Sequence, residues 1–253
     1  MRSMPVWRKP EMKPTISMSV WRRPEYTKMV LDALRDNYLA SRYQLVVAVD
    51  CEGAKPNPEV MAILKEQTWP TAVKIIEMPG HCGCNRTIHA AMSSAFEDTD
   101  YVIHIEDDVV LARDGLAWFE WAGEQWQTDP SVFTITAWRH PSGWLPESGQ
   151  PRPAYAHEHV QRESFFTCWG WATWRDRWAT IEPAWSKKSD FELSWDVQMS
   201  ALRGTRVQLA PHVGRASNIG AMKGTHRGHV IQSYWRGDDK FVAPSPYFVE
   251  VQP

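Results

Sequence analysis

The sequence contains no long hydrophobic segment. No run of about 18 consecutive apolar residues occurs, the length that a membrane-spanning helix needs. Residues 1–14 are rich in proline and basic side chains, with Glu11 as their acid, so they lack the apolar centre of a signal peptide. The sequence therefore predicts no transmembrane segment and a cytoplasmic location.

Neither a charge excess nor many cysteines are present. Because 28 basic residues stand against 30 acidic ones, net charge does not demand a nucleic acid or an anionic membrane as partner. Four cysteines fit a reduced compartment better than a disulfide framework. Cys82 and Cys84 lie beside His81, but no second pair follows at zinc-ligand spacing, which disfavours a zinc site.

Short apolar runs alternate with amphipathic segments in the first half of the chain. Strands are expected at Thr15–Val20, Leu45–Val49, Ala72–Ile76, Tyr101–Ile105 and Ser131–Ala137, and helices from Pro24, at Pro56–Gln67, at Asn85–Phe96 and at Asp114–Trp126. This alternation predicts right-handed crossovers and a parallel sheet.

Glycine-rich phosphate loops are absent from this α/β pattern. No G-x-G-x-x-G follows the first strand, and no G-x-x-x-x-G-K-[ST] occurs anywhere in the chain. A Rossmann dehydrogenase and a P-loop nucleotidase are both disfavoured. If a nucleoside diphosphate binds here, a metal must neutralise it in place of a glycine loop.

Three consecutive acids end the fourth predicted strand. Glu106, Asp107 and Asp108 would lie at the carboxyl edge of the sheet, where α/β folds bind ligands. Arg23 and Asp50 also follow strands, so they are expected on the same edge. Carboxylates crowded there repel one another, and a divalent cation such as Mg²⁺ or Mn²⁺ would remove that cost. The alternative is a solvated junction between strand and loop.

The second half is rich in tryptophan. Many of the 15 tryptophans fall between Trp118 and Trp195, which hints at an aromatic-lined pocket, although an aromatic core explains most of them. Trp171, Trp174 and Trp178 have the spacing of one helical face, so a helix is expected from about Gly170. A shorter helix from Ser194 and a strand at Val207–Ala210 are expected to follow.

Several motifs in a fixed order resemble those of GT-A fold glycosyltransferases. They are Val47–Cys51, Glu106–Asp108, Trp169–Trp171, Trp195–Asp196 and a later Gly-x-x-His. Among characterised proteins, they resemble the N-acetylglucosaminyltransferase I family. Trp169–Arg175 and Asn218–Gly220 also look like segments of bacterial nucleotide-sugar transferases.

The resemblance implies an α/β GT-A fold, in which helices flank a mostly parallel central sheet. Residues 1–14 would be a basic N-terminal extension. Residues 15–137 would form the nucleotide-sugar-binding half, and residues 138–253 the acceptor-binding and catalytic half of the same domain.

On the donor side, the resemblance assigns a role to each rim residue. Arg23 and Asp50 would hold a uridine base, while Glu106 and Asp107 would contact ribose and sugar hydroxyls. Asp108 would bind Mn²⁺, or Mg²⁺, against the diphosphate of a UDP-sugar. The reaction itself also requires a carboxylate that can hold a divalent ion, because negative charge develops on the departing nucleoside diphosphate and the ion stabilises it.

On the acceptor side, the resemblance makes Asp196 the general base and therefore implies inversion at the anomeric carbon. A carboxylate suits this role because an acceptor hydroxyl is a poor nucleophile until it loses its proton. His226 would lie near the metal and the diphosphate. Simpler roles are a helix cap for Asp196, a pair with Glu25 for Arg23 and surface exposure for His226.

The function expected from these residues is a metal-dependent inverting glycosyltransferase that acts on a hydroxyl of a glycan. Trp138–Glu163 is unlike the acceptor region of the relatives, so the acceptor cannot be transferred from them. A DNA glycosyltransferase acting on a hydroxymethylated base is a less favoured alternative, suggested by the basic N-terminal segment and by the basic excess over Val213–Lys240. A non-catalytic module that binds nucleotide sugars is a second alternative.

Overall fold

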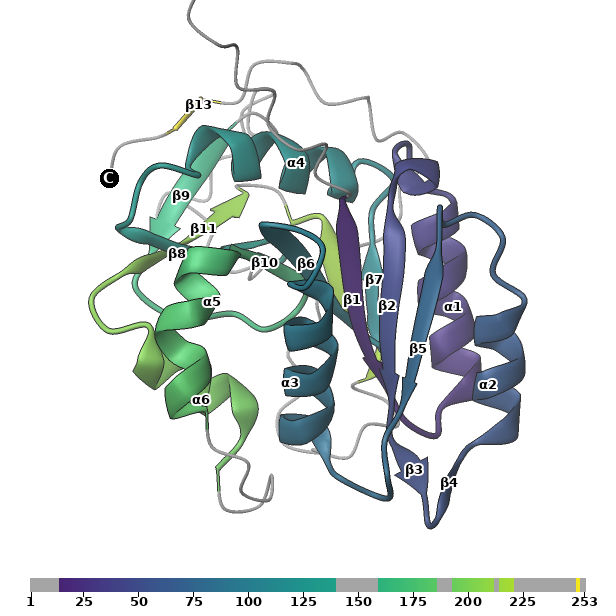
Figure 1. Ribbon diagram of the computed structural model, residues 1–253. Coiled ribbons are helices and arrows are strands. Elements are labelled where there is room, and N and C mark those ends of the chain that lie inside the picture. Colours follow the sequence, from purple (N-terminus) through teal and green to yellow (C-terminus); the bar gives the residue numbers. More distant parts are fainter. Residues whose placement is uncertain (1–13, 140–158, 186–192, 212–213, 221–248, 251–253) are drawn as a thin grey trace, which may run out of the picture.

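The computed structural model describes residues 14–139, 159–185, 193–211, 214–220 and 249–250 (Figure 1). Within these residues the strands of the main sheet are β1 (Thr15–Val20), β2 (Gln44–Val49), β5 (Val73–Glu77), β6 (Tyr101–Glu106), β8 (Val132–Thr136), β9 (His159–Glu163), β10 (Trp171–Trp174), β11 (Val207–Pro211) and β13 (Val249–Glu250). Short strands β3 (Cys51–Glu52), β4 (Lys55–Pro56), β7 (Val109–Leu111) and β12 (Ala216–Asn218) form two small ladders outside it.

The helices are α1 (Pro24–Arg35), α2 (Pro58–Lys65), α3 (Cys84–Ala95), α4 (Gly115–Gln125), α5 (Arg175–Ile181) and α6 (Trp195–Leu202), with short 3₁₀ turns at Ala40–Arg42 and Glu182–Ala184. In the described part of the chain, none of them is both long and apolar enough to cross a membrane.

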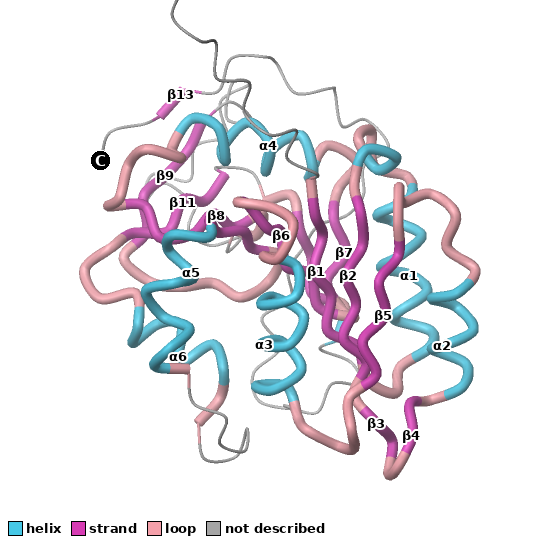
Figure 2. The backbone as a smooth tube through the Cα atoms, in the orientation of Figure 1, coloured by secondary structure: helices cyan, strands magenta, loops and turns pink. Residues whose placement is uncertain are grey.

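The main sheet has the strand order β13-β9-β11-β8-β10-β6-β1-β2-β5 and lies at the centre of the molecule (Figure 2). Strands β6, β1, β2 and β5 run parallel to one another, as the alternating sequence predicts. Strand β10 is antiparallel to both β6 and β8, whereas β11 runs parallel to β8. The sheet is therefore mixed but mostly parallel, which confirms the predicted fold class.

Each face of the sheet buries its own hydrophobic core. On one face, residues of α1, α2 and α4 such as Leu31 and Phe119 pack against Ile16 and neighbouring strand residues. On the other face, α3, α5 and α6 cover the sheet, and Met92 and Trp178 belong to that core. Figure 1 shows α3 on the near side of the sheet, away from α1 and α2. Covering both faces explains why the parallel strands are continuous apolar runs.

The prediction of a helix from about Gly170 is wrong. Trp171–Trp174 is strand β10, and α5 begins at Arg175. Trp171 and Trp174 consequently point to opposite faces of the sheet, one into each core. The aromatic spacing allowed both structures, and β10 forms because it pairs with β6 and β8 and fills the gap between them.

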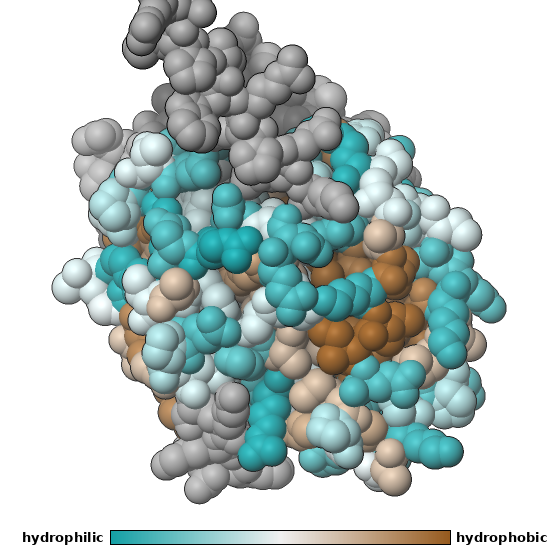
Figure 3. All heavy atoms as spheres, in the orientation of Figure 1, coloured by the Kyte–Doolittle hydropathy of each residue, from teal (hydrophilic) through white to brown (hydrophobic). Residues whose placement is uncertain are grey.

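Strand β5 forms an exposed edge of the sheet. Its Ile75 and Ile76 are partly buried, and Figure 3 shows apolar atoms gathered where β2 and β5 lie in Figure 1. Lys74 of the same strand pairs with Glu97 at 2.8 Å. Charged side chains on an edge strand oppose pairing with another chain.

Candidate active site

The acid triplet lies at the carboxyl end of β6, next to the end of β1. Arg23 Nε donates to Asp107 Oδ2 at 3.2 Å, and its Nη2 contacts Asp107 Oδ1. Arg23 Nη1 donates to Asp108 Oδ2 at 2.9 Å. Two of the three acids are therefore paired with a cation of the protein itself.

The charges at this edge are not balanced by Arg23. Burial, together with Asp108 and Asp107, raises the pKa of Glu106 well above its ordinary value, and Glu106 Oε1 is buried with no hydrogen-bond partner in the part of the chain that the structure describes. Burial raises the pKa of Asp107 to about 6, against the lowering effect of Arg23. Burial lowers the pKa of Arg23, but the two aspartates outweigh it and raise that pKa above its ordinary value. The site thus has excess negative charge in a poorly solvated position.

Asp108 is also held by the end of β12 and the residue that follows it. Asn218 Nδ2 donates to Asp108 Oδ1 at 3.3 Å, and the Ile219 N–H donates to the Asp108 carbonyl at 2.8 Å. Asn218 Oδ1 accepts from the Gly220 N–H at 2.8 Å, so Asn218 also orients the local backbone. Pairing of β12 with β7, directly after the triplet, brings this distant segment to the acids.

Asp50 organises the loop before α3. Its carboxylate accepts from the backbone N–H groups of Cys51, Cys82 and Gly83 at 2.9, 2.7 and 3.0 Å. His81 Nδ1 lies 2.8 Å from Asp50 Oδ2, and the His81 ring stacks on Trp21 with centroids 4.9 Å apart. Asp50 is therefore a structural anchor of this rim, and its contact with a base stays a prediction.

Asp196 lies in the first turn of α6. Ser194, not Asp196, occupies the N-cap position, and its hydroxyl donates to Asp196 Oδ1 at 2.5 Å. The neighbouring Trp195 is buried and stacks on Trp171 of β10, with centroids 6.0 Å apart. This packing anchors the helix start, and it also means that Trp171 and Trp195 face the core instead of a ligand.

Asp196 and the triplet lie within electrostatic reach of each other. The charge of Asp196 contributes to the raised pKa of Glu106. Burial, then Glu106 and Asp196, raise the pKa of Cys168 well above its ordinary value, so this thiol lies near both acids. No role for Cys168 was predicted from the sequence, although its position directly before the Trp169–Trp171 motif was a usable signal.

The structure thus brings five of the predicted site residues close together, namely Arg23, Glu106, Asp107, Asp108 and Asp196, while Asp50 follows the neighbouring strand β2. His226 lies outside the described residues. No group of three or more His, Cys, Asp or Glu side chains in the described part of the chain is arranged to enclose a metal ion.

Little of the basic surface proposed for DNA falls on described residues. The N-terminal segment and most of Val213–Lys240 lie outside them. Arg215 belongs to that stretch but is 1% exposed, and its Nε donates to Asp114 at 2.8 Å in the core. Arg215 therefore cannot contribute to a phosphate-binding surface, nor contact a diphosphate.

Comparison with solved structures supports the GT-A fold. Staphylococcus aureus TarS 1–349 superposes with a TM-score of 0.58 at 10% identity, covering 81% of this chain and 60% of that one. The mannosyltransferase PcManGT from Pyrobaculum calidifontis, solved with GDP-Man and Mn²⁺, gives a TM-score of 0.50 at 16% identity, covering 85% and 61%. At such identities the likeness shows the fold alone.

Comparison with sequences gives the family. Alpha-1,3-mannosyl-glycoprotein 2-beta-N-acetylglucosaminyltransferase of Arabidopsis thaliana is 26% identical over 135 residues, which are 53% of this chain and 28% of that protein. The chain thus matches less than a third of that relative's length. A model of the GNT-I family matches residues 1–241. Because this match covers nearly the whole chain, the chain belongs to the GNT-I family and has the fold of the GT-A glycosyltransferases.

Proposed function

We propose that the protein is a metal-dependent, inverting glycosyltransferase that transfers a sugar from a UDP-sugar to a hydroxyl of a glycan. The observation that carries this proposal is the position of Asp196 beside the triplet of Glu106, Asp107 and Asp108, close enough for its charge to contribute to the raised pKa of Glu106. Family membership and the GT-A fold support the same reaction class.

The residues at the triplet fit a divalent cation that the diphosphate helps to hold. Among the described residues Glu106 Oε1 is buried without a hydrogen-bond partner, and burial, reinforced by Asp108, raises the pKa values of Glu106 and Asp107 in spite of Arg23. A site with one or two carboxylates is sufficient for Mg²⁺ or Mn²⁺ when substrate phosphates supply further oxygen ligands. Asp108 would be the protein ligand, and the bound ion would stabilise charge on the departing diphosphate.

Asp196 is suited to remove the proton from the acceptor. It lies in the first turn of α6, where the helix dipole interacts favourably with an acidic side chain. The hydrogen bond from Ser194 restricts its orientation. A single displacement, with Asp196 deprotonating the acceptor hydroxyl as the sugar leaves the diphosphate, inverts the anomeric carbon. Glu106 and Asp107 are proposed to contact donor hydroxyls.

The remaining donor contacts follow the same proposal. Arg23 and Asp50 would face the uridine, and His226 would contribute near the diphosphate. A glycan is the preferred acceptor, and a hydroxymethylated base in DNA is the alternative that an electrophoretic shift at low salt would reveal.

Binding and chemistry are tested separately with two variants. UDP is expected to raise the melting temperature of the wild type in Mn²⁺ but not in EDTA, and Asp108→Asn should abolish that shift. Asp196→Asn should keep the shift but lower sugar transfer to a panel of glycan acceptors about 10²- to 10⁴-fold, the usual value of general-base help. Asp32→Asn, which changes a carboxylate on the surface of α1, serves as the matched control.

Two results would contradict the proposal. Stabilisation by another nucleotide without metal would reject the base and metal assignments. UDP-sugar binding without any release of UDP, in the wild type and in both variants, would favour the non-catalytic binding module.

A further inference from the structure

Arg23 is fixed by its backbone as well as by its guanidinium. It occupies the N-cap position of α1, and its carbonyl accepts from the Thr27 N–H and from Thr27 Oγ1, both at 2.9 Å. Pro24 follows at the first helical position and restricts the chain further. The guanidinium also lies over the ring of Tyr26, 5.5 Å from its centroid. Arg23 is therefore positioned by α1 to reach the two aspartates at the end of β6.

The contact with Asp108 conflicts with metal binding by the same carboxylate. Asp108 Oδ2 accepts from Arg23 Nη1 at 2.9 Å, and Oδ1 accepts from Asn218 at 3.3 Å. Both oxygens of the proposed ligand thus already have donors. A divalent ion lies about 2.0–2.2 Å from a carboxylate oxygen, so an ion on Oδ2 would crowd a like-charged guanidinium.

We propose that Arg23 is an internal counter-ion of the metal-free site, which releases Asp108 when the divalent cation binds and keeps its contact with Asp107. This inference rests on the proposed function in taking Asp108 as the metal ligand. In this role Arg23 acts through the two carboxylates that it holds in place, so it is a positioning residue.

The exchange has a consequence for metal affinity. Arg23 contacts Asp107 through Nε and Nη2, so Asp108 can be released while the fork to Asp107 remains. The cation must displace the charge-assisted hydrogen bond between Arg23 and Asp108, and the loss of this bond makes the free energy of metal binding less favourable. Metal alone should then bind weakly, and binding should strengthen when a nucleoside diphosphate adds its own ligands to the ion.

The test measures Mn²⁺ binding to the protein without nucleotide, by the paramagnetic resonance signal of free Mn²⁺. Arg23→Met is expected to bind Mn²⁺ at least about tenfold more tightly than the wild type, the factor that loss of one charge-assisted hydrogen bond implies. Its melting temperature in EDTA should be lower than that of the wild type, and Mn²⁺ should restore most of the loss. Arg23→Lys, which keeps the charge but not the fork, should fall between the two.

Arg35→Met is the matched control, since Arg35 is half exposed on the same helix and pairs with Asp32 at 2.9 Å. It should bind Mn²⁺ like the wild type. Equal or weaker Mn²⁺ binding by Arg23→Met overturns the inference, as does an absence of Mn²⁺ binding in every variant. If Arg23→Met does not fold, Arg23→Lys decides, and unchanged affinity in that variant also overturns it. These results are independent of transfer activity, so a protein that binds Mn²⁺ as expected but transfers no sugar would reject the proposed function alone.

Discussion

Asp108 depends on a residue that has no side chain. A Cβ added at Gly220 would lie 2.1 Å from Asp108 Oδ2 and 2.8 Å from its Cγ, far inside contact distance. The carboxylate cannot remain where it is unless position 220 is glycine. Because the Ile219 N–H also bonds the Asp108 carbonyl, the loop itself has little freedom to move away.

Gly220→Ala should therefore displace the carboxylate of Asp108. We expect sugar transfer to fall about 100-fold, the loss that a 1 Å displacement of a catalytic group commonly causes. Mn²⁺ affinity should fall with it, while far-ultraviolet circular dichroism stays unchanged. Gly80→Ala is the control, since a Cβ there would meet nothing within 4 Å. Wild-type Mn²⁺ affinity in Gly220→Ala would show that Asp108 is not the ligand.

Single residues were predictable where their chemistry is visible in the local sequence. Glu106, Asp107 and Asp108 follow an apolar strand directly, so their place on the sheet edge could be derived. The Arg23 contacts and the bracing by Asn218 were not predicted in detail, because they join residues 84 to 110 positions apart. Spacing along the chain contains no information about such pairs.

Helices and strands of the first half were predicted within a few residues. Their apolar runs are bounded by Pro24, Asn57 and similar signals, and Asn57 caps α2 by accepting from two backbone N–H groups. The second half was harder, since β10 is inserted between β6 and β8 and its tryptophans serve two cores. Long-range pairing overrode the local aromatic pattern there.

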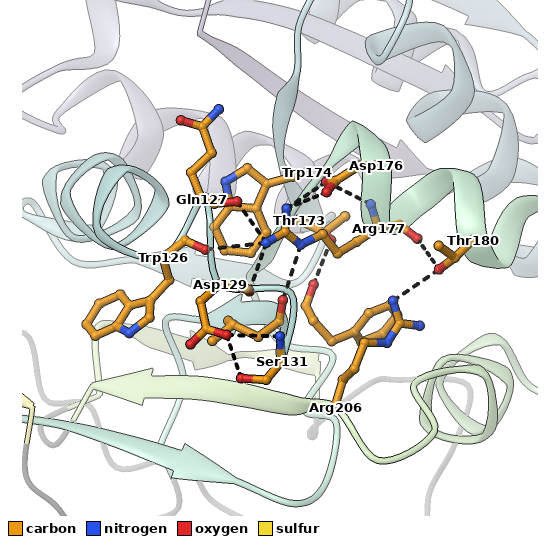
Figure 4. A network of polar contacts seen from close by, with 12 residues as sticks. Trp126, Gln127, Asp129, Ser131, Thr173, Trp174, Asp176, Arg177, Thr180 and Arg206 are labelled. Carbon is orange, nitrogen blue, oxygen red and sulfur yellow. Dashed lines mark hydrogen bonds and ion pairs between the residues drawn. The ribbon is translucent and has the colours of Figure 1, made fainter.

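One buried arginine joins α5 to the connection between α4 and β8. Arg177 donates to the carbonyls of Gln127 and Asp129 at 2.8 and 2.9 Å, and its side chain is 5% exposed (Figure 4). Its guanidinium lies 4.4 Å from the ring centroid of Trp174, and Nη1 contacts both oxygens of Asp176 at 2.7 Å. These contacts connect α5 to the loop between α4 and β8, where the carbonyls of Gln127 and Asp129 are not paired within a sheet.

Arg177→Met should destabilise the fold by about 3 kcal/mol or more, because buried carbonyls left without donors cost about 1–3 kcal/mol each. Urea unfolding measures this difference. Arg175→Met is the matched control, since the pair that Arg175 forms with Asp100 is about half exposed and should contribute less than about 1 kcal/mol. Equal effects of the two substitutions would contradict the importance of the buried network.

At the scale of the whole molecule, buried titratable groups have opposite effects on how stability depends on pH. Burial raises the pKa of Asp107 from 3.8 to about 6 and that of Glu106 well above 4.5. Burial lowers the pKa of His104 from 6.5 to about 3. The folded chain therefore binds protons on the acids more tightly than the unfolded chain, and it binds a proton on the histidine less tightly.

The sign of each contribution follows from this linkage. For Asp107 and Glu106, the folded state is favoured at low pH, and this advantage is lost as pH rises through the raised pKa values. For His104, stability instead rises with pH between about 3 and 6.5. Hydrogen bonds from Lys28 and Ser131 lower the pKa values of Asp32 and Asp129, whose contributions are complete by about pH 5.

Between pH 5 and pH 8 Asp107 and His104 act in opposite directions, so we expect Glu106, which is buried beside two aspartates and has a pKa well above its ordinary value, to decide the net change in stability. We expect the metal-free protein to be more stable at pH 5 than at pH 8 in urea unfolding with EDTA, because Glu106 must ionise in a buried position. Glu106→Gln should weaken this dependence, since an amide does not titrate. Mn²⁺ at pH 8 should raise the stability of the wild type more than that of the variant, because a divalent ion lowers the cost of the ionised carboxylates. A wild type whose stability rises from pH 5 to pH 8, in parallel with the variant, would show that Glu106 is not the group whose ionisation limits the free site.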